Sequence, residues 1–333
     1  MSETTQKTFQ NIRGTFDVLP GGSDAGETRI PGSPAWRYVE DLVQEVFERY
    51  HFEEIRTPIL EPTELIARGV GELTDIVTKE MFAFERGDTH YVLRPEITAP
   101  VMRAYLQHHL DQRGGVQKLY YVGPCFRAEK PQKGRYRQFH QFGVEIMGAA
   151  DPRADVETIL SQLDVYRALG LEDLDLRINT LGGPGDRDAY RSALRSYLES
   201  YEDELSETSR RRLEENPLRI LDTKLEHEQD ILADAPELID YVSEESRAHY
   251  ETVLGTLADM DVAYTEDRSL VRGLDYYTET AFEIDSPHLG AQSALGGGGR
   301  YDLLAEELGS EEPVPSVGFA AGFERLFLAL REE

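Results

Sequence analysis

The sequence contains almost no cysteine and no long apolar run, and both absences restrict its class. Its one cysteine, Cys125, cannot form an internal disulfide or supply a thiolate cluster for a metal ion, so zinc is not expected. No run of about 18 apolar residues occurs, and the first residues, MSETTQKTFQ, lack the apolar core of a signal peptide. We therefore expect a cytoplasmic protein without a membrane-spanning segment.

Two frequent nucleotide-binding patterns are missing as well. The chain has no GxxxxGKS or GxxxxGKT loop and no GxGxxG after a predicted strand, which excludes P-loop and Rossmann sites. No zinc-binding spacing or nucleophilic triad stands out either. A bound nucleotide must then be held mainly by arginine side chains.

Positive charge is scarce in the chain as a whole. Lys and Arg total 35 against 63 Asp and Glu, and the formal net charge is -28. At molar salt the Debye length falls to about 3 Å and self-repulsion is screened, so we interpret the acidity as halophilic adaptation that says little about function. Local basic clusters then become more informative. The length of 333 residues indicates roughly two domains of about 150 residues each.

The strongest basic cluster lies in a predicted hairpin. Tyr, Val and Phe recur over residues 118–129 and 137–148, and the intervening KPQKG carries the Pro and Gly typical of a turn. Positive charge exceeds negative charge there: Arg127, Lys130, Lys133, Arg135 and Arg137 against Glu129. This local reversal of sign indicates an anionic partner, and a solvated basic turn is the simpler alternative.

One face of the second strand has the composition of a ligand-binding floor. Side chains alternate in direction along a strand, so one face carries Arg137, Phe139, Gln141, Gly143 and Glu145. Gly143 leaves a gap between an amide and a carboxylate. The pattern predicts a site for a small polar ligand.

The stretch RAEKPQKGRYRQFHQFGVE, residues 127–145, is similar to the second signature motif of the class II aminoacyl-tRNA synthetases, in the form found in the histidyl-tRNA synthetase family. The resemblance covers nearly the whole chain as far as residue 330 and stops where that family's anticodon-binding domain would begin. It implies an α+β class II catalytic core, with a mostly antiparallel sheet flanked by helices, a helical insertion domain and a homodimeric assembly.

Two stretches before the hairpin support the resemblance. Residues 35–50 have apolar side chains at helical spacing, and FEEIRTPILEP follows as a strand broken by prolines. This order resembles the first class II motif, which implies a dimer interface, although an amphipathic helix packed in its own core is the alternative. HYVLRPEITAP resembles the family's RPEGT segment with Ile97 in place of Gly, and implies that Glu96 and Thr98 hold the amino group of an amino acid. Thr98 as an ordinary helix cap is the other interpretation.

Residues 183–262 change to charged helices separated by Pro217 and Pro236. The resemblance implies an insertion that approaches the acceptor arm of a tRNA. A solvated helix face explains Arg210 to Arg212 equally well. We therefore predict a first core part over 1–182, a helical insertion over 183–262 and a second core part over 263–333.

Three stretches near the end complete the pattern. LVRGLDYYT resembles the first histidine-specific motif of the family and implies roles for Arg272 and Tyr277. ALGGGGRYDLL resembles the second; its glycines, before a helix predicted at Asp302, allow close backbone approach to a ligand, whereas a glycine run by itself is more often a turn. VGFAAGFERLFLAL, a predicted strand and helix, resembles the third class II motif and contributes Arg325.

The resemblance implies a division of roles among these residues. The catalytic residues are Arg127, Arg272 and Arg325. Histidine is bound by Glu96, Thr98, Gln141, Glu145 and Tyr277. ATP is bound by Arg127, Glu129, Arg135 and Arg325. The tRNA acceptor end meets Gln132 and Lys133. Mg²⁺ is implied on the ATP phosphates, with no ligand set from the chain.

This arrangement suits an activation reaction, because a carboxylate is already a nucleophile and attack on the α-phosphorus needs mainly alignment and cationic stabilisation. We expect activation of L-histidine by ATP and its transfer to tRNA(His). The alternatives are a histidine-sensing regulatory subunit of ATP phosphoribosyltransferase, which lacks the anticodon-binding domain, and a generic ATP-binding module. The intact arginine motifs favour the enzyme, and the missing C-terminal domain indicates a fragment or a natural short form.

Overall fold

The computed structural model describes residues 9–25, 28–72, 74–221, 223, 225–271, 274, 276–290 and 293–332. Arg272 lies outside these ranges, so its predicted role is addressed by the sequence alone.

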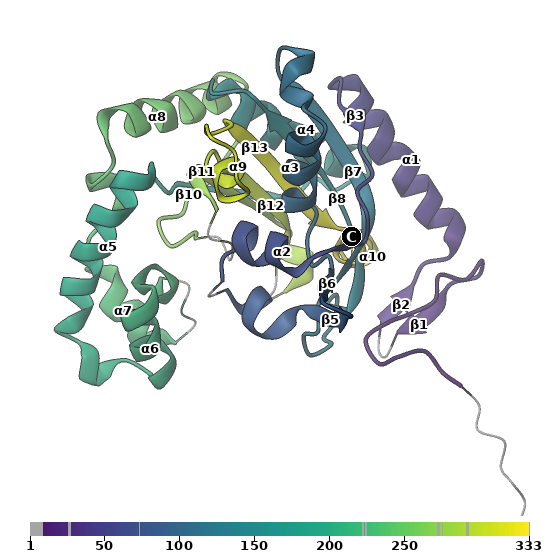
Figure 1. The fold of residues 1–333 in the computed structure, drawn as a ribbon, viewed down its shortest axis with the longest axis horizontal. Helices are drawn as coiled ribbons and strands as arrows, with labels where there is room; N and C mark the ends of the chain where they lie inside the picture. Colours follow the sequence, from purple (N-terminus) through teal and green to yellow (C-terminus); the bar gives the residue numbers. More distant parts are fainter. Residues whose placement is uncertain are drawn as a thin grey trace, which may run out of the picture.

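An eight-stranded sheet forms the centre of the described part of the chain, in the order β10-β9-β11-β12-β13-β8-β7-β3 (Figure 1). Only the two edge pairs, β10 with β9 and β3 with β7, are parallel. This confirms the predicted α+β class with a mostly antiparallel sheet. The strands are β3 Glu53–Glu54, β7 Gln117–Phe126, β8 Gln138–Met147, β9 Asp175–Thr180, β10 Thr265–Glu266, β11 Thr278–Asp285, β12 Ala294–Arg300 and β13 Ser316–Gly322.

Two smaller sheets accompany the large one. One pairs β1 Ser23–Ala25 with β2 Thr28–Ile30. The other contains β4 Leu60–Pro62, β6 Thr89–Leu93 and β5 Phe82–Arg86.

The helices are α1 Ser33–Arg49, α2 Thr63–Val70, α3 Thr98–Gln107, α4 Arg153–Ala168, α5 Pro184–Glu199, α6 Glu207–Glu215, α7 Glu226–Ala233, α8 Glu244–Asp259, α9 Leu304–Glu307 and α10 Phe323–Glu332. Short single turns lie at Ile76–Glu80, Leu110–Arg113, Glu202–Glu204, Pro217–Ile220, Leu238–Asp240 and Pro287–Leu289. No helix in the described ranges has the length and apolar content needed to cross a lipid bilayer.

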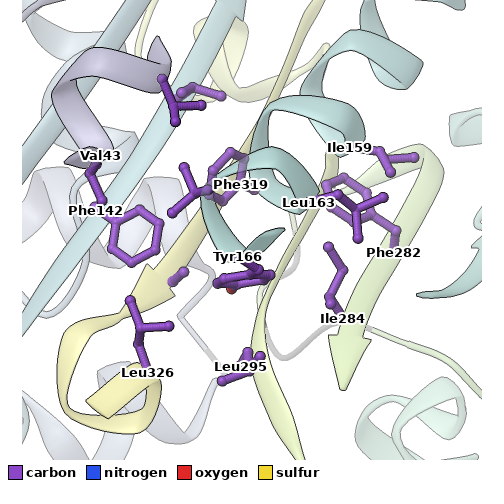
Figure 2. Packing of buried hydrophobic residues seen from close by; sticks show 14 of the residues in the cluster. Val43, Phe142, Ile159, Leu163, Tyr166, Phe282, Ile284, Leu295, Phe319 and Leu326 are labelled. Carbon is purple, nitrogen blue, oxygen red and sulfur yellow. The ribbon is translucent and has the colours of Figure 1, made fainter. Parts of the chain in front are cut away.

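The main hydrophobic core lies on one face of the sheet, beneath α1, α4, α8 and α10. Figure 2 shows Val43 of α1 and Leu326 of α10 beside Phe142 of β8, with Tyr166 of α4 close by. The helix predicted over 35–50 is confirmed as α1, whose buried residues recur at helical spacing. Filling this face with apolar side chains leaves the opposite face of the same strands available for polar ones.

The predicted hairpin is confirmed as β7 and β8, paired from Gln117 with Met147 to Phe126 with Gln138. The first strand ends at Phe126 rather than 129, because beyond it the backbone N–H of Ala128 donates to Glu80 and that of Arg137 donates to Gly14, instead of pairing across the hairpin. Val144 faces the main core, so its neighbours in the chain face the other side.

The glycine run is part of a strand, which excludes the alternative interpretation of a turn. It lies in β12 between β11 and β13, where a side chain on Gly298 would overlap the carbonyl oxygen of Gly318. The following helix begins at Leu304 rather than at Asp302.

The helices α5, α6 and α7 lie apart from the sheet (Figure 1) and have a core of their own, which includes Leu194, Leu213 and Ile220. In contrast, α8 packs on the main core through Tyr250, Val253 and Leu257. The predicted boundaries of the insertion stay a prediction.

A buried ionic cluster connects α4, α8 and β12. Arg300 is 1% exposed, and its Nε donates to Asp155 Oδ1 at 3.3 Å, while its Nη1 donates to the carbonyl oxygen of Ala149 at 2.8 Å. His249 Nε2 lies 3.3 Å from the same Asp155 oxygen. Burial alone would raise the pKa of Asp155, but His249 and Arg300 outweigh burial and lower it. The carboxylate therefore stays ionised inside the protein.

We expect Asp155→Asn to lower the free energy of unfolding by about 3 kcal/mol, because it removes the fully buried counter-ion of Arg300 and leaves only the partly exposed Asp302, at 3.2 Å, to balance that charge. Urea denaturation of the variant and the parent chain measures this difference. The control is Glu64→Gln, which removes an exposed ion pair with Arg68 on α2 and should change stability much less. Equal effects of the two substitutions would contradict a structural role for the buried cluster.

Candidate active site

The sheet face opposite the main core carries a buried carboxylate at its centre. Glu145 projects from β8 over the neighbouring strand β13, where a side chain on Gly318 would overlap the carboxylate. Two residues earlier, a side chain on Gly143 would come within 2.5 Å of the Tyr121 hydroxyl. The absence of side chains at these two positions is what makes room for Glu145 and Tyr121.

Two hydroxyl groups donate to the Glu145 carboxylate. Thr98 Oγ1 donates to Oε1 at 2.7 Å, and the Tyr301 hydroxyl donates to Oε2. Burial raises the pKa of Glu145 to about 8; the negative charge of Glu96 adds to this rise, and the two hydroxyl groups oppose it. A carboxylate has about four lone-pair sites, so it can accept from a ligand as well.

Glu96 places Thr98 in this position. The Glu96 carboxylate accepts the backbone N–H of Thr98 at 2.7 Å and that of Ala99 at 3.1 Å, at the start of α3. This excludes the alternative interpretation of Thr98 as the helix cap. Ile97 occupies the cap position, Glu96 satisfies the first helical N–H groups, and the Thr98 hydroxyl is directed to Glu145.

The two described catalytic candidates lie on different elements. Arg127 follows β7; its Nε donates to the carbonyl oxygen of Pro95 at 3.0 Å, and its guanidinium lies 5.3 Å from the centre of the Phe139 ring. Arg325 lies in the first turn of α10, and its Nε donates to the carbonyl oxygen of Ala294 at 2.5 Å.

Electrostatics relate these arginines to the hairpin and to Glu96. Burial lowers the pKa of Arg325, and the positive charge of Arg135 lowers it further. Arg135 itself forms an exposed pair with Glu129, Nη1 to Oε2 at 3.4 Å. Burial raises the pKa of Glu96, and Arg127 opposes this rise. The charge of Arg325 is therefore disfavoured by Arg135 and favoured by the carboxylates of Glu283 and Asp285.

The remaining predicted residues surround the same face. Cys125, which is buried, donates its thiol to Gln141 Oε1 at 3.2 Å, and burial raises the pKa of that thiol to about 12. Tyr277 is buried beside Tyr276, with ring centres 4.7 Å apart, and its carbonyl oxygen accepts from Arg187 of α5 at 2.7 Å.

Gln132 and Lys133 are exposed at the tip of the hairpin. The backbone of Gln132 pairs with that of Arg135 across the turn, N to O at 3.1 Å. This turn holds both side chains on a short, defined loop at the end of β7 and β8.

Sequence reasoning missed the tyrosines around Glu145. Tyr121, Tyr276 and Tyr301 are all buried, and the negative charge of Glu145 contributes to raising the pKa of each hydroxyl, after the larger effect of burial. The available signal was Tyr301, two residues after the glycine run, and it is informative only once that run is placed in a strand.

In the part of the chain that the structure describes, no group of three or more His, Cys, Asp or Glu side chains is arranged to hold a metal ion. The site is instead composed of buried carboxylates, hydroxyl groups and arginines.

Comparison with known proteins gives a consistent result. The family model described as Histidyl-tRNA synthetase matches residues 33–326. The chain is 53% identical over 326 residues to the histidine–tRNA ligase of Synechococcus sp. (strain JA-3-3Ab). The aligned region covers 98% of this chain and 75% of that protein. It is 50% identical to the histidine–tRNA ligase of Synechocystis sp. (strain ATCC 27184 / PCC 6803 / Kazusa), over 97% of this chain and 70% of that protein.

Solved structures show the same relationship. The crystal structure of apo S. aureus histidyl-tRNA synthetase superposes with a TM-score of 0.77 at 39% identity, over 98% of this chain and 74% of that one. An ATP phosphoribosyltransferase regulatory subunit/histidyl-tRNA synthetase from Bacillus halodurans gives a TM-score of 0.68 at 23% identity, over 98% of this chain and 84% of that one. At that identity the second likeness shows the fold alone.

We expect the raised pKa of Glu145 to make stability depend on pH. The folded state holds the Glu145 proton more tightly than the unfolded chain does, where the pKa is an ordinary 4.5. The protonated Glu145 side chain therefore contributes fully to the free energy of unfolding below about pH 4.5, and this contribution is lost as the pH rises through about 8. The side chain in Glu145→Gln cannot titrate, so the free energy of unfolding of this variant should fall by a few kcal/mol less over that pH range than that of the parent chain. Thermal denaturation at pH 5 and pH 8.5 compares the two proteins, with exposed Glu64→Gln as the control. Parallel pH profiles would contradict the expectation.

Proposed function

The chain belongs to the histidyl-tRNA synthetase family, and on that premise we propose that the sheet face around Glu145 is where histidine is activated. Relatives about 50% identical over nearly the whole chain are named histidine–tRNA ligase, so the chain is an aminoacyl-tRNA ligase for histidine. The observation that carries the proposed site is the buried Glu145 carboxylate with hydroxyl donors on either side. The regulatory alternative has only a shared fold in its favour.

Glu145 is the residue that selects histidine. Its carboxylate accepts an imidazole N–H, and Tyr277 serves the other ring nitrogen. A ligand without those groups would leave buried polar atoms unpaired, and sites of this kind discriminate by about 10⁴ without editing. Glu96, Thr98 and Gln141 hold the amino group and the rest of the amino acid.

Arginines hold the nucleotide. Arg127 contacts the α-phosphate and the histidine carboxylate, and Arg135 and Arg325 contact the outer phosphates, with Glu129 beside Arg135. Arg272 completes the set at the reacting centre. Planar guanidinium groups suit this because they bind phosphate and carboxylate bidentately and remain charged. Mg²⁺ enters with ATP as part of that substrate.

The reaction has two steps. A carboxylate oxygen of histidine attacks the α-phosphorus, which forms histidyl-adenylate and releases pyrophosphate. A hydroxyl of the terminal tRNA ribose then attacks the activated carbonyl, which forms the ester and releases AMP. The chain's own contribution to the first step is alignment and stabilisation of charge.

We propose further that the chain acts as a homodimer in the cytoplasm. An apolar patch on the three-stranded sheet supports the dimer, because Leu60 and Phe84 lie on one face and are 43% and 46% exposed. Sedimentation of a Leu60→Asp variant tests this proposal. An unchanged oligomeric state would exclude the patch as the dimer contact.

We also propose adaptation to molar salt, supported by the net charge of -28. Thermal denaturation in dilute buffer and in molar salt tests this proposal. Full stability in dilute buffer would contradict it.

Arg127→Ala should reduce histidine-dependent ATP–pyrophosphate exchange by about 10²–10³, because a donor to the developing charge is lost. The fold should be retained, since the side chain contacts one backbone carbonyl and the Phe139 ring. Exchange is measured in molar salt with and without histidine. Arg56→Ala, at an exposed arginine, is the matched control. Near-normal exchange in Arg127→Ala would exclude its assigned role.

Replacing Gln132 and Lys133 together with Ala should impair transfer to tRNA(His) more than activation. Both side chains lie at the exposed hairpin tip, beyond the residues assigned to ATP. Single-turnover transfer from preformed adenylate is compared with pyrophosphate exchange for the same variant. If both steps fell equally, the tip would serve ATP alone.

A further inference from the structure

The Glu324 carboxylate contacts both the backbone and the ring of His140. The carboxylate accepts the His140 backbone N–H, at 2.9 Å to Oε1 and 3.1 Å to Oε2. His140 Nδ1 lies 3.0 Å from Oε1, and because a carboxylate can only accept, this nitrogen carries the proton. Glu324 is 5% exposed, so these bonds are largely shielded from water.

The contact occurs where β13 stops pairing with β8. The last paired residues are Gly322 and Gln141, after which the chain of β13 turns into α10. His140, the next residue of β8, would lose its acceptor at this point. The Glu324 side chain supplies that acceptor, so the hydrogen-bonding edge of β8 continues onto the first turn of a helix.

The two partners are each next to a residue of the proposed site. His140 precedes Gln141, whose side chain is on the ligand face, and Glu324 precedes Arg325. The Arg325 side chain reaches the start of β12 at the carbonyl oxygen of Ala294. A shift of α10 along β8 would therefore change the distance between Arg325 and the histidine pocket.

The ring of His140 also packs against Trp36 of α1, with ring centres 5.0 Å apart in an edge-to-face arrangement. Trp36 in turn stacks on Phe323, at 5.6 Å. Packing on Trp36 alone would make His140 a core residue without consequence for the site. A test must therefore distinguish the effect of the Nδ1–H hydrogen bond from the effect of the ring packing on Trp36.

We propose that His140 and Glu324 are a positioning pair that fixes Arg325 relative to the histidine pocket and thereby sets the affinity for the ATP phosphates. The pair touches neither substrate and acts through Arg325. This inference rests on the proposed role of Arg325 in ATP binding.

The experiment compares His140→Asn with His140→Gln. An Asn amide nitrogen can occupy nearly the position of Nδ1 and donate to Glu324, whereas the longer Gln side chain places its amide beyond that position. Both substitutions remove the ring from Trp36, so a packing role would make the two variants alike. His90→Asn, at an exposed histidine of β6, is the control.

We expect His140→Gln to raise the KM for ATP in pyrophosphate exchange about tenfold while leaving the KM for histidine within twofold. His140→Asn should stay within about twofold of the parent chain for both substrates. The stabilisation of the protein by Mg·ATP, measured as a rise in Tm, should follow the same order and needs no catalysis.

Equal behaviour of the two variants, or a parallel change in both KM values, would overturn the positioning role. A parent chain that is stabilised by Mg·ATP but shows no exchange would instead contradict the proposed function. In that case the Tm series still decides whether His140 and Glu324 control ATP affinity.

Discussion

The cost of burying a carboxylate in the middle of a sheet is the constraint on which the site depends. An ionised group removed from water loses several kcal/mol of hydration, so Glu145 must be given donors by the protein or hold a proton. Thr98 and Tyr301 supply the donors, and Thr98 can do so because Glu96 satisfies the N–H groups at the start of α3. Glu96, Thr98 and Glu145 form one connected arrangement in which each determines the position of the next, and Tyr301 completes it from β12.

The opposite face of the sheet supports this arrangement. Arg300 and Tyr301 are adjacent in the chain, yet Arg300 joins the buried cluster with Asp155 and His249 while Tyr301 reaches Glu145. The ionic cluster thus holds the end of β12 in place from the sheet face opposite the site. A tyrosine hydroxyl that must meet one carboxylate oxygen benefits from a backbone that cannot shift, because hydrogen bonds weaken steeply with misalignment.

Local patterns in the sequence predicted the elements better than the contacts between them. Alternation identified the hairpin and the polar face of β8, and helical spacing identified α1. The position of the glycine run inside a strand could not be predicted because its reason is tertiary: the backbones of β11 and β13 come too close to Gly298 and Gly299 for side chains. The link between Asp155 and Arg300 spans 145 residues, a separation at which no local rule operates. A capping role for Thr98 stayed open as an alternative because nothing nearby in sequence shows that Glu145 accepts a hydrogen bond from its hydroxyl.

The start of α10 shows why local rules fail where function is concentrated. An acidic residue in the first helical turn is favoured by the helix dipole, and Glu324 obeys this rule, whereas a cation there is disfavoured. Arg325 occupies that turn, is largely buried, and lies close enough to Arg135 for the two charges to repel. Burial and Arg135 disfavour the charge of Arg325, whereas the carboxylates of Glu283 and Asp285 favour it, and the net effect lowers its pKa. If these two arginines hold the ATP phosphates as proposed, the polyphosphate would relieve the repulsion between them, and the conditions that oppose the charge of Arg325 would increase the gain on binding. The neighbouring Glu324 is hydrogen-bonded to His140, and on the proposed roles this contact would hold the start of α10 in place before the nucleotide binds.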